Sequence, residues 1–173
     1  MSDFLIVVDM QKDFVDGSLG TAEAVAIVPA VKARIAKAEA DGEKIIFTRD
    51  THEENYMDTQ EGKNLPVPHC IRGTAGWEII PELAAYAERN IIFDKPTFGS
   101  QKLGEYLASQ QDIGKITVIG LCTDICVISN ALLIKAFLPE APIVVEKACC
   151  AGVTPESHDR ALAAMQSCQI RID

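Results

Sequence analysis

The sequence predicts an α/β protein, a three-layer α/β/α sandwich with a mostly parallel six-stranded sheet. Short apolar runs alternate with segments of helical spacing along the whole chain, which is the pattern of repeated strand–helix–strand units. Several of the runs are apolar on both faces, as expected for a parallel sheet covered by helices on each side. No repeat, low-complexity tract or linker interrupts the alternation, so we expect a single domain over residues 1–173.

Six short apolar runs are expected to form the strands: Phe4–Asp9, Lys44–Asp50, Asn90–Asp94, Lys115–Gly120, Pro142–Glu146 and Gln169–Ile172. The segments between them with helical spacing are Ile27–Ala40, Glu82–Arg89, Gln101–Gln110, Asp124–Phe137 and Pro155–Ser167. Thr154 before Pro155 is typical of a helix N-cap followed by proline at the first helical position. The segment from Thr51 to Trp77 is long and polar for a connection, and such loops tend to contain functional residues.

Composition and charge limit the partners of the protein. The 173 residues are 48% hydrophobic and have a net charge of −9, and they lack the clustered Lys and Arg residues that bind nucleic acids. No apolar run approaches the roughly 20 residues needed to cross a bilayer. Six cysteines occur without an N-terminal signal sequence, so we expect a cytoplasmic protein with reduced thiols, in which Cys149 and Cys150 pack in the core.

Cys126 is the first candidate functional residue, because it is expected at the start of a helix that follows a buried strand. Thr123 or Asp124 would cap this helix, and the free N–H groups and positive dipole of its first turn would stabilise a thiolate. Cys122 and Cys126 lie four residues apart, so the alternative is that both simply fill space in the core.

Ligands of open parallel sheets bind beyond the carboxyl ends of the strands. Titratable residues lie at the carboxyl ends of four of the expected strands, either as the last strand residue or shortly after it: Asp9, Asp50, Asp94 with Lys95, and Cys122 with Cys126. We expect Asp9, Lys95 and Cys126 to share one pocket, where Asp9 would accept the thiol proton and Lys95 would favour the charged forms of both groups. The alternatives are that Asp9 caps the following turn and that Lys95 is an ordinary solvated lysine.

A second group of candidate residues lies in the long loop. Asp50 and His52 are two residues apart in extended chain and point to the same side, and His69 follows a stiff Pro-Val-Pro sequence. Two imidazoles and a carboxylate suit a divalent transition metal with open positions, and Glu61 offers a further oxygen. The alternative is that both histidines lie on the loop surface. We expect His158, on the last helix, to be solvated.

Five stretches of this sequence resemble the isochorismatase-like cysteine hydrolases, and most closely their nicotinamidase/pyrazinamidase branch. They are DMQKDF (9–14), TRDTHEEN (48–55), PVPHCIRGTAG (66–76), KPTFGS (95–100) and GLCTDICV (120–127). The resemblance spans nearly the whole chain. The pattern G-x-x-T-D-x-C-V after a strand is specific, and the D-x-H and P-H pair distinguishes nicotinamidases from many relatives.

The resemblance implies that Asp9, Lys95 and Cys126 form a catalytic triad. It also implies a cis peptide bond between Leu121 and Cys122, which would direct the backbone N–H of Cys122, with that of Cys126, at the substrate oxygen. The metal site would comprise Asp50, His52, His69 and Glu61, with zinc as the expected ion and manganese or iron as alternatives. The substrate ring would lie against aromatic and apolar residues, for which the candidates are Phe14, Phe98, Leu121, Tyr56 and Trp77.

The activity that this resemblance implies is hydrolysis of nicotinamide, and of pyrazinamide, to the carboxylic acid and ammonia through a cysteine thioester. Such an enzyme would act in NAD salvage and would be a homo-oligomer with a small-molecule amide as its substrate and no nucleic-acid or membrane partner. The alternative substrate is a carbamoyl or ureido compound, or another small amide. Isochorismate cleavage is disfavoured, because that branch lacks a nucleophilic cysteine at the position of Cys126. A third alternative is a non-catalytic binding protein in which Cys126 is a redox-sensitive thiol.

Overall fold

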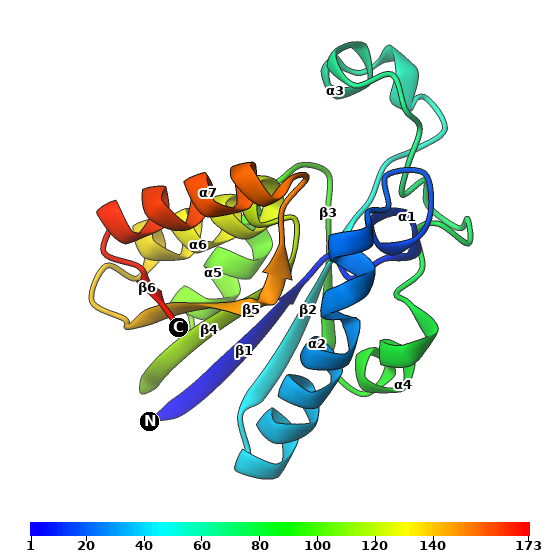
Figure 1. The fold of residues 1–173 in the computed structure, drawn as a ribbon. Coiled ribbons are helices and arrows are strands. Elements are labelled where there is room, and N and C mark those ends of the chain that lie inside the picture. Colours follow the sequence, from blue (N-terminus) through cyan, green and yellow to red (C-terminus); the bar gives the residue numbers. More distant parts are fainter.

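A six-stranded parallel sheet forms the middle layer of the protein, as the computed structural model of residues 1–173 shows (Figure 1). The strand order is β3-β2-β1-β4-β5-β6, and each neighbouring pair is parallel. The strands are β1 (Ser2–Val8), β2 (Lys44–Asp50), β3 (Ile91–Lys95), β4 (Ile113–Leu121), β5 (Ile143–Ala151) and β6 (Arg171–Ile172). The predicted fold class is therefore confirmed.

Helices cover both faces of the sheet. The helices α2 (Ala22–Asp41) and α4 (Pro81–Glu88) lie on one face, and α5 (Gln101–Ala108), α6 (Ile128–Phe137) and α7 (Pro155–Ser167) lie on the other (Figure 1). None of the helices combines the length and apolar character that a membrane crossing requires.

Strand β1 explains why the sheet is apolar on both sides. Its residues from Phe4 to Val8 are all fully buried, and successive side chains enter the two core clusters in turn. Leu5 and Val7 pack on the side of α2 and α4. The other three side chains pack on the opposite side, against α5, α6 and α7; they are Phe4, Ile6 and Val8. Each fully buried side chain of this size contributes about 1.5–3 kcal/mol, so the central strand is a major source of stability.

Several elements differ from the expectation. The helix expected at Ile27 begins at Ala22, because Thr21 accepts a hydrogen bond from the Ala24 N–H and caps it. Strand β5 continues to Ala151 beyond the expected end at Glu146. The helix expected from Asp124 begins with a π-helical turn, η2 (Thr123–Val127). Three short helices lie in segments expected to be loops: α1 (Lys12–Val15), η1 (Tyr56–Asp58) and α3 (Gln60–Asn64).

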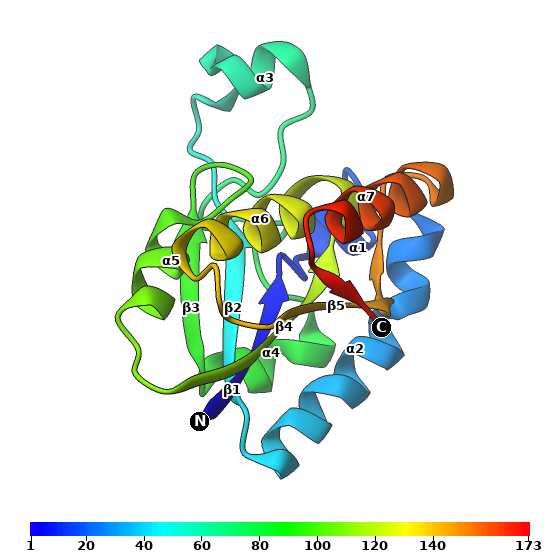
Figure 2. The same ribbon diagram turned by 90° about the vertical axis from the view of Figure 1, so that its left-hand side faces the viewer.

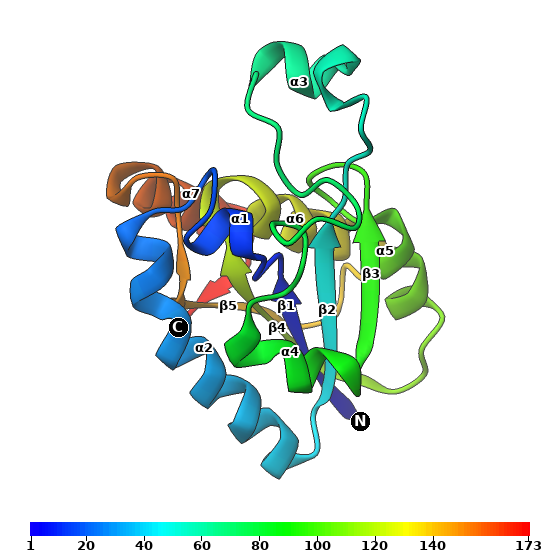
Figure 3. The same cartoon turned by 90° about the vertical axis from the view of Figure 1, so that its right-hand side faces the viewer.

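Residues 53–68 form an arm that projects from the body of the protein beyond the carboxyl ends of the strands and contains η1 and α3 (Figures 2 and 3). Its hydrogen bonds are mainly internal. The Tyr56 hydroxyl donates to the Leu65 carbonyl at 2.8 Å, and Thr59 caps α3 by accepting from the Gly62 N–H at 3.0 Å. Hydrogen bonds among its own residues therefore hold the shape of the arm.

Candidate active site

Asp9, Lys95 and Cys126 come together at the carboxyl ends of the strands. The Lys95 Nζ lies 2.6 Å from Asp9 Oδ2 and 3.4 Å from Cys126 Sγ. It also donates to the Thr97 carbonyl at 3.0 Å and lies 3.4 Å from Asp50 Oδ1. The three side chains are buried, so an acid, an amine and a thiol share one desolvated site, as expected from the sequence. A solvated Lys95 is excluded.

The backbone around Asp9 holds its carboxylate in place. Asp9 follows β1 with a φ of 49°, a conformation that few residues other than glycine adopt, and its N–H donates to the Thr48 carbonyl. The Thr48 hydroxyl donates to Asp9 Oδ1 at 2.7 Å. On the other side of β1, Gly120 packs so closely that a Cβ there would overlap the Val8 carbonyl oxygen. This close approach brings the turn after β4 next to Asp9.

Burial determines which groups of this site are charged. It raises the pKa of the Cys126 thiol well above its ordinary value, and the Lys95 charge opposes that shift only in part. Burial also raises the pKa of Asp9, again against the effect of Lys95. For Lys95, burial lowers the pKa, but the charges of Asp9, Cys126 and Asp50 outweigh it and the net shift is upward. Burial therefore favours the neutral thiol of Cys126, whereas Lys95 favours the thiolate, so attack on a substrate calls for a base close to the sulfur.

The turn that contains Cys126 also differs from the expectation in its capping. Neither Thr123 nor Asp124 is the N-cap, because η2 begins after Cys122 and has no side-chain cap. Thr123 Oγ1 instead lies 2.7 Å from His158 Nδ1, and Asp124 Oδ1 accepts from the Val153 N–H at 3.1 Å. The expectation of a solvated His158 is therefore wrong, since its ring contacts a buried threonine. The peptide bond between Leu121 and Cys122 is cis.

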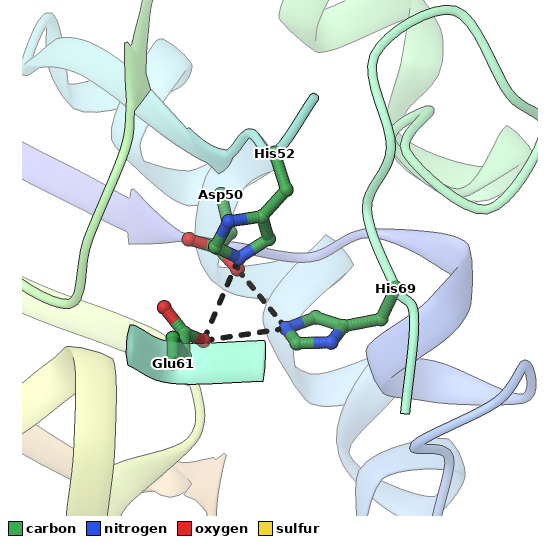
Figure 4. A group of neighbouring side chains, drawn as sticks. All are labelled: Asp50, His52, Glu61 and His69. Carbon is green, nitrogen blue, oxygen red and sulfur yellow. Dashed lines mark hydrogen bonds and ion pairs between the residues drawn. The ribbon is translucent and has the colours of Figure 1, made fainter. Parts of the chain in front are cut away.

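The four expected metal ligands also come together. One ligand atom from each of Asp50, His52, Glu61 and His69 lies within 4.8 Å of the others (Figure 4). His52 Nε2 lies 3.0 Å from Asp50 Oδ2 and 3.5 Å from Glu61 Oε1. His69 Nε2 lies 3.5 Å and 3.7 Å from the same two oxygens. Two imidazoles and two carboxylates are a donor set that suits a divalent transition metal, so these residues fit such an ion.

Contacts behind this group orient its ligands. His69 Nδ1 lies 2.8 Å from the Val67 carbonyl, so its Nε2 faces the group. Burial alone would raise the pKa of Asp50, but hydrogen bonds with both histidines and the charge of Lys95 hold it below its usual range. Asp50 is therefore ionised at neutral pH, as a metal ligand must be. The Tyr56 ring packs edge-on against the rings of both histidines, at centroid distances of 4.8 and 5.0 Å.

A cavity opens between the triad and the metal-ligand group. It is lined by Phe14, Leu19, Asp50, Glu61, Leu65, His69, Phe98, Cys122, Ile125 and Cys126. Phe14 and Phe98 thus line the cavity, as the family resemblance implies. Leu121 does not, because its side chain is fully buried in the core on the α2 side of the sheet. Trp77 is also absent from the lining, since its ring stacks under the Arg49 guanidinium and its Nε1 donates to Thr51 Oγ1.

Sequence reasoning missed two buried residues that hold the site together. Gln11 accepts from the Asp50 N–H and donates to the Asp50 carbonyl, both at 2.7 Å, so it fixes the backbone of a metal ligand. Asn130 donates to the Cys126 carbonyl at 2.8 Å and accepts from the Ser100 N–H at 2.9 Å. A buried amide four residues after Cys126 in an apolar helix is the signal that would have found Asn130. The partner of Gln11 is 39 residues away, so no local signal reveals it.

The family model described as the isochorismatase domain matches residues 3–172, nearly the whole chain. The chain belongs to the isochorismatase family.

Two solved structures resemble the chain over nearly its whole length, and a third relative matches most of its sequence. A pyrazinamidase/nicotinamidase from Streptococcus mutans is 30% identical, with a TM-score of 0.87 over 99% of this chain and 100% of that one. The pyrazinamidase of Pyrococcus horikoshii in complex with zinc is also 30% identical, with a TM-score of 0.84 over 100% of this chain and 99% of that one. A nicotinamidase/pyrazinamidase from Mycobacterium tuberculosis is 28% identical over 141 residues, which are 73% of this chain and 75% of that protein.

Proposed function

We propose that this isochorismatase-family protein is an amidohydrolase that converts nicotinamide and pyrazinamide to the carboxylic acid and ammonia. The main support is that Asp9 and Lys95 lie next to Cys126, which lines a cavity shared with three side chains of the possible metal site. The similarity to nicotinamidases and pyrazinamidases from three organisms supports the same substrate class. The cavity wall offers Phe14 and Phe98 as surfaces for a flat ring.

Cys126 is the proposed nucleophile and Asp9 the proposed base. Asp9 accepts the thiol proton as the sulfur attacks the carboxamide carbon. The Lys95 ammonium stabilises the Asp9 carboxylate before this transfer and the negative charge that develops on the sulfur during it. The backbone N–H groups of Cys122 and Cys126 stabilise the oxyanion, a contribution of about 3 kcal/mol per donor in comparable sites. Asp9 then protonates the departing ammonia. Water hydrolyses the thioester to the acid and regenerates the thiol.

Asp50, His52, His69 and Glu61 are the proposed ligands of one divalent metal ion, with zinc as the expected ion and manganese or iron as alternatives. When bound, this ion would supply a Lewis-acid contact for a ring nitrogen of the substrate. The presence of zinc in the P. horikoshii relative supports this choice. A single domain over the whole chain, a cytoplasmic location and a homo-oligomeric state stay predictions.

The experiment that tests this function is ammonia release from nicotinamide, pyrazinamide and an N-carbamoyl amino acid, measured side by side on the zinc-loaded protein. We expect turnover of both aromatic carboxamides and little of the carbamoyl compound, because apolar side chains dominate the cavity wall. Faster release from the carbamoyl compound would identify the alternative substrate class. No release from any of the three would contradict the proposal and favour a binding protein.

A further inference from the structure

Two hydrogen bonds connect the turn that contains Cys126 to α7 and to the segment that precedes α7. His158 lies in the first turns of α7, and its ring Nδ1 is 2.7 Å from the fully buried Thr123 hydroxyl. One residue further along the turn, Asp124 Oδ1 accepts from the Val153 N–H at 3.1 Å. The first two residues of η2 are therefore held by a part of the chain that lies some thirty residues later in the sequence.

The turn η2 is π-helical and leads directly into α6. The Ile128 N–H donates to the Thr123 carbonyl, five residues earlier, where an α-helix would bond four residues earlier. A single π-helical turn inserted before an α-helix is rare and occurs mostly at functional sites. If η2 relaxed to an α-helix, its residues would rotate about the helix axis and Cys126 Sγ would no longer face Lys95 Nζ. Near the C-terminal end of η2, the Asn130 side-chain amide donates a hydrogen bond to the Cys126 carbonyl.

We propose that His158 is a positioning residue for Cys126, acting through the Thr123 hydroxyl to keep η2 π-helical. His158 is not among the residues that line the active-site cavity, and its side-chain hydrogen bond is to Thr123 rather than to a triad side chain. The backbone at His158 is itself fixed, because Gly152 packs so closely that a Cβ there would overlap the His158 N and Cα atoms. This inference rests on the proposed function in so far as Cys126 is the nucleophile.

Two pairs of variants test this role. Thr123→Val removes the hydroxyl at nearly constant volume, whereas Thr123→Ser retains it. His158→Ala removes the ring, whereas His158→Asn keeps a polar atom near the position of Nδ1. The measurements are kcat and KM for nicotinamide and the rate at which iodoacetamide alkylates Cys126, followed by mass spectrometry.

We expect Thr123→Val and His158→Ala to lower kcat by about tenfold or more, with KM nearly unchanged, since a displacement of about 1 Å in a catalytic group can cost ~100-fold. Alkylation of Cys126 should slow in parallel. Thr123→Ser and His158→Asn should recover most of both rates, and the double variant should lose little more than either single variant.

Ser157→Ala is the matched control, because it removes the Oγ that accepts from the Thr154 N–H in the capping box of α7 but leaves the side chains of His158 and Thr123 unchanged. An equal loss of kcat in this variant would assign the effect to the stability of α7 and overturn the proposal. A folded Thr123→Val protein with wild-type kcat and alkylation rate would also overturn it. If the wild-type protein releases no ammonia from any amide, the proposed function fails, but the alkylation rates still decide the role of His158.

Discussion

Among single residues, the buried polar side chains near the active site differ in whether they have hydrogen-bond partners. The Asp9 carboxylate is fully buried, and its Oδ1 accepts from the Thr48 hydroxyl. Thr117, on the neighbouring strand β4, is equally buried, but its hydroxyl has no hydrogen-bond partner. The two threonines are therefore equally buried, but only the Thr48 hydroxyl has a hydrogen-bond partner. The same substitution at both positions thus separates the effect of the hydrogen bond from that of burial.

Thr48→Val should lower the free energy of unfolding by about 1–3 kcal/mol, because it leaves a buried carboxylate oxygen without its donor. The hydrogen bond from Thr48 lowers the pKa of Asp9, so its loss should raise that pKa further. Since Asp9 must be ionised to act as the base, the acidic limb of the pH profile of kcat/KM should move to higher pH. Urea denaturation and the pH profile measure the two effects.

Thr117→Val is the control for this prediction and should leave both the stability and the pH profile nearly unchanged. An acidic limb that stays in place in Thr48→Val, despite the lower stability, would mean that Asp9 is not the group that titrates in catalysis.

Among the secondary-structure elements, the projecting arm of residues 53–68 (Figures 2 and 3) supplies side chains to the metal-ligand group. Glu61 Oε1 lies near His52 and His69, and the Tyr56 ring packs on the same two histidines. Glu61 and Leu65 also line the active-site cavity. An ion held by Glu61 would therefore fix the arm and complete one wall of the cavity at the same time.

Zinc should slow amide hydrogen exchange in residues 53–68, and Glu61→Gln should abolish most of this protection. The physical reason is that exchange reports local opening, and Glu61 is the only proposed ligand that lies in α3. We also expect the zinc affinity to fall by at least the roughly 10- to 100-fold that loss of a supporting partner costs. Glu54→Gln, an exposed carboxylate of the same arm, is the control. Equal protection in wild-type and Glu61→Gln proteins would contradict the role of Glu61.

Some features of the site could be predicted from the sequence, and others could not. Asp9, Asp50 and Lys95 could be found because each ends a short apolar run, and parallel strands present their carboxyl ends at one edge. The π-helical turn at Cys126 could not, because its apolar spacing is that of an ordinary helix and its support comes from His158. The sequence also could not show that the Leu121 side chain packs in the core rather than in the cavity wall, since only the tertiary structure tells which face of the sheet the last strand residue enters.

At the scale of the whole molecule, the strand order explains where the site lies. The chain builds β1, β2 and β3 in one direction and then returns to place β4 on the other side of β1. Ligands of open α/β sheets bind at the point where this order reverses. Asp9 follows β1 and the turn with Cys126 follows β4, so both lie at that point, and Lys95 reaches it from the end of β3 beside Asp50.

A bound metal should therefore stabilise the whole fold, because its proposed ligands join β2 to the arm and are far apart in the unfolded chain. Zinc at 100 times its dissociation constant should raise the free energy of unfolding by about 2.7 kcal/mol. Urea denaturation with zinc and with a chelator measures this increment, which should largely disappear in His69→Ala. An increment that is the same in this variant would place the bound zinc elsewhere.

The most direct test of the central claim, that Cys126 is the nucleophile of an amidohydrolase, is the kcat for ammonia release from nicotinamide by folded Cys126→Ala protein. We predict a loss of more than roughly 1,000-fold, as expected when a covalent nucleophile is removed. Cys168→Ala, which changes an exposed cysteine, should retain the wild-type rate. A Cys126→Ala enzyme that keeps a rate within about tenfold of wild type would show that Cys126 is not the nucleophile.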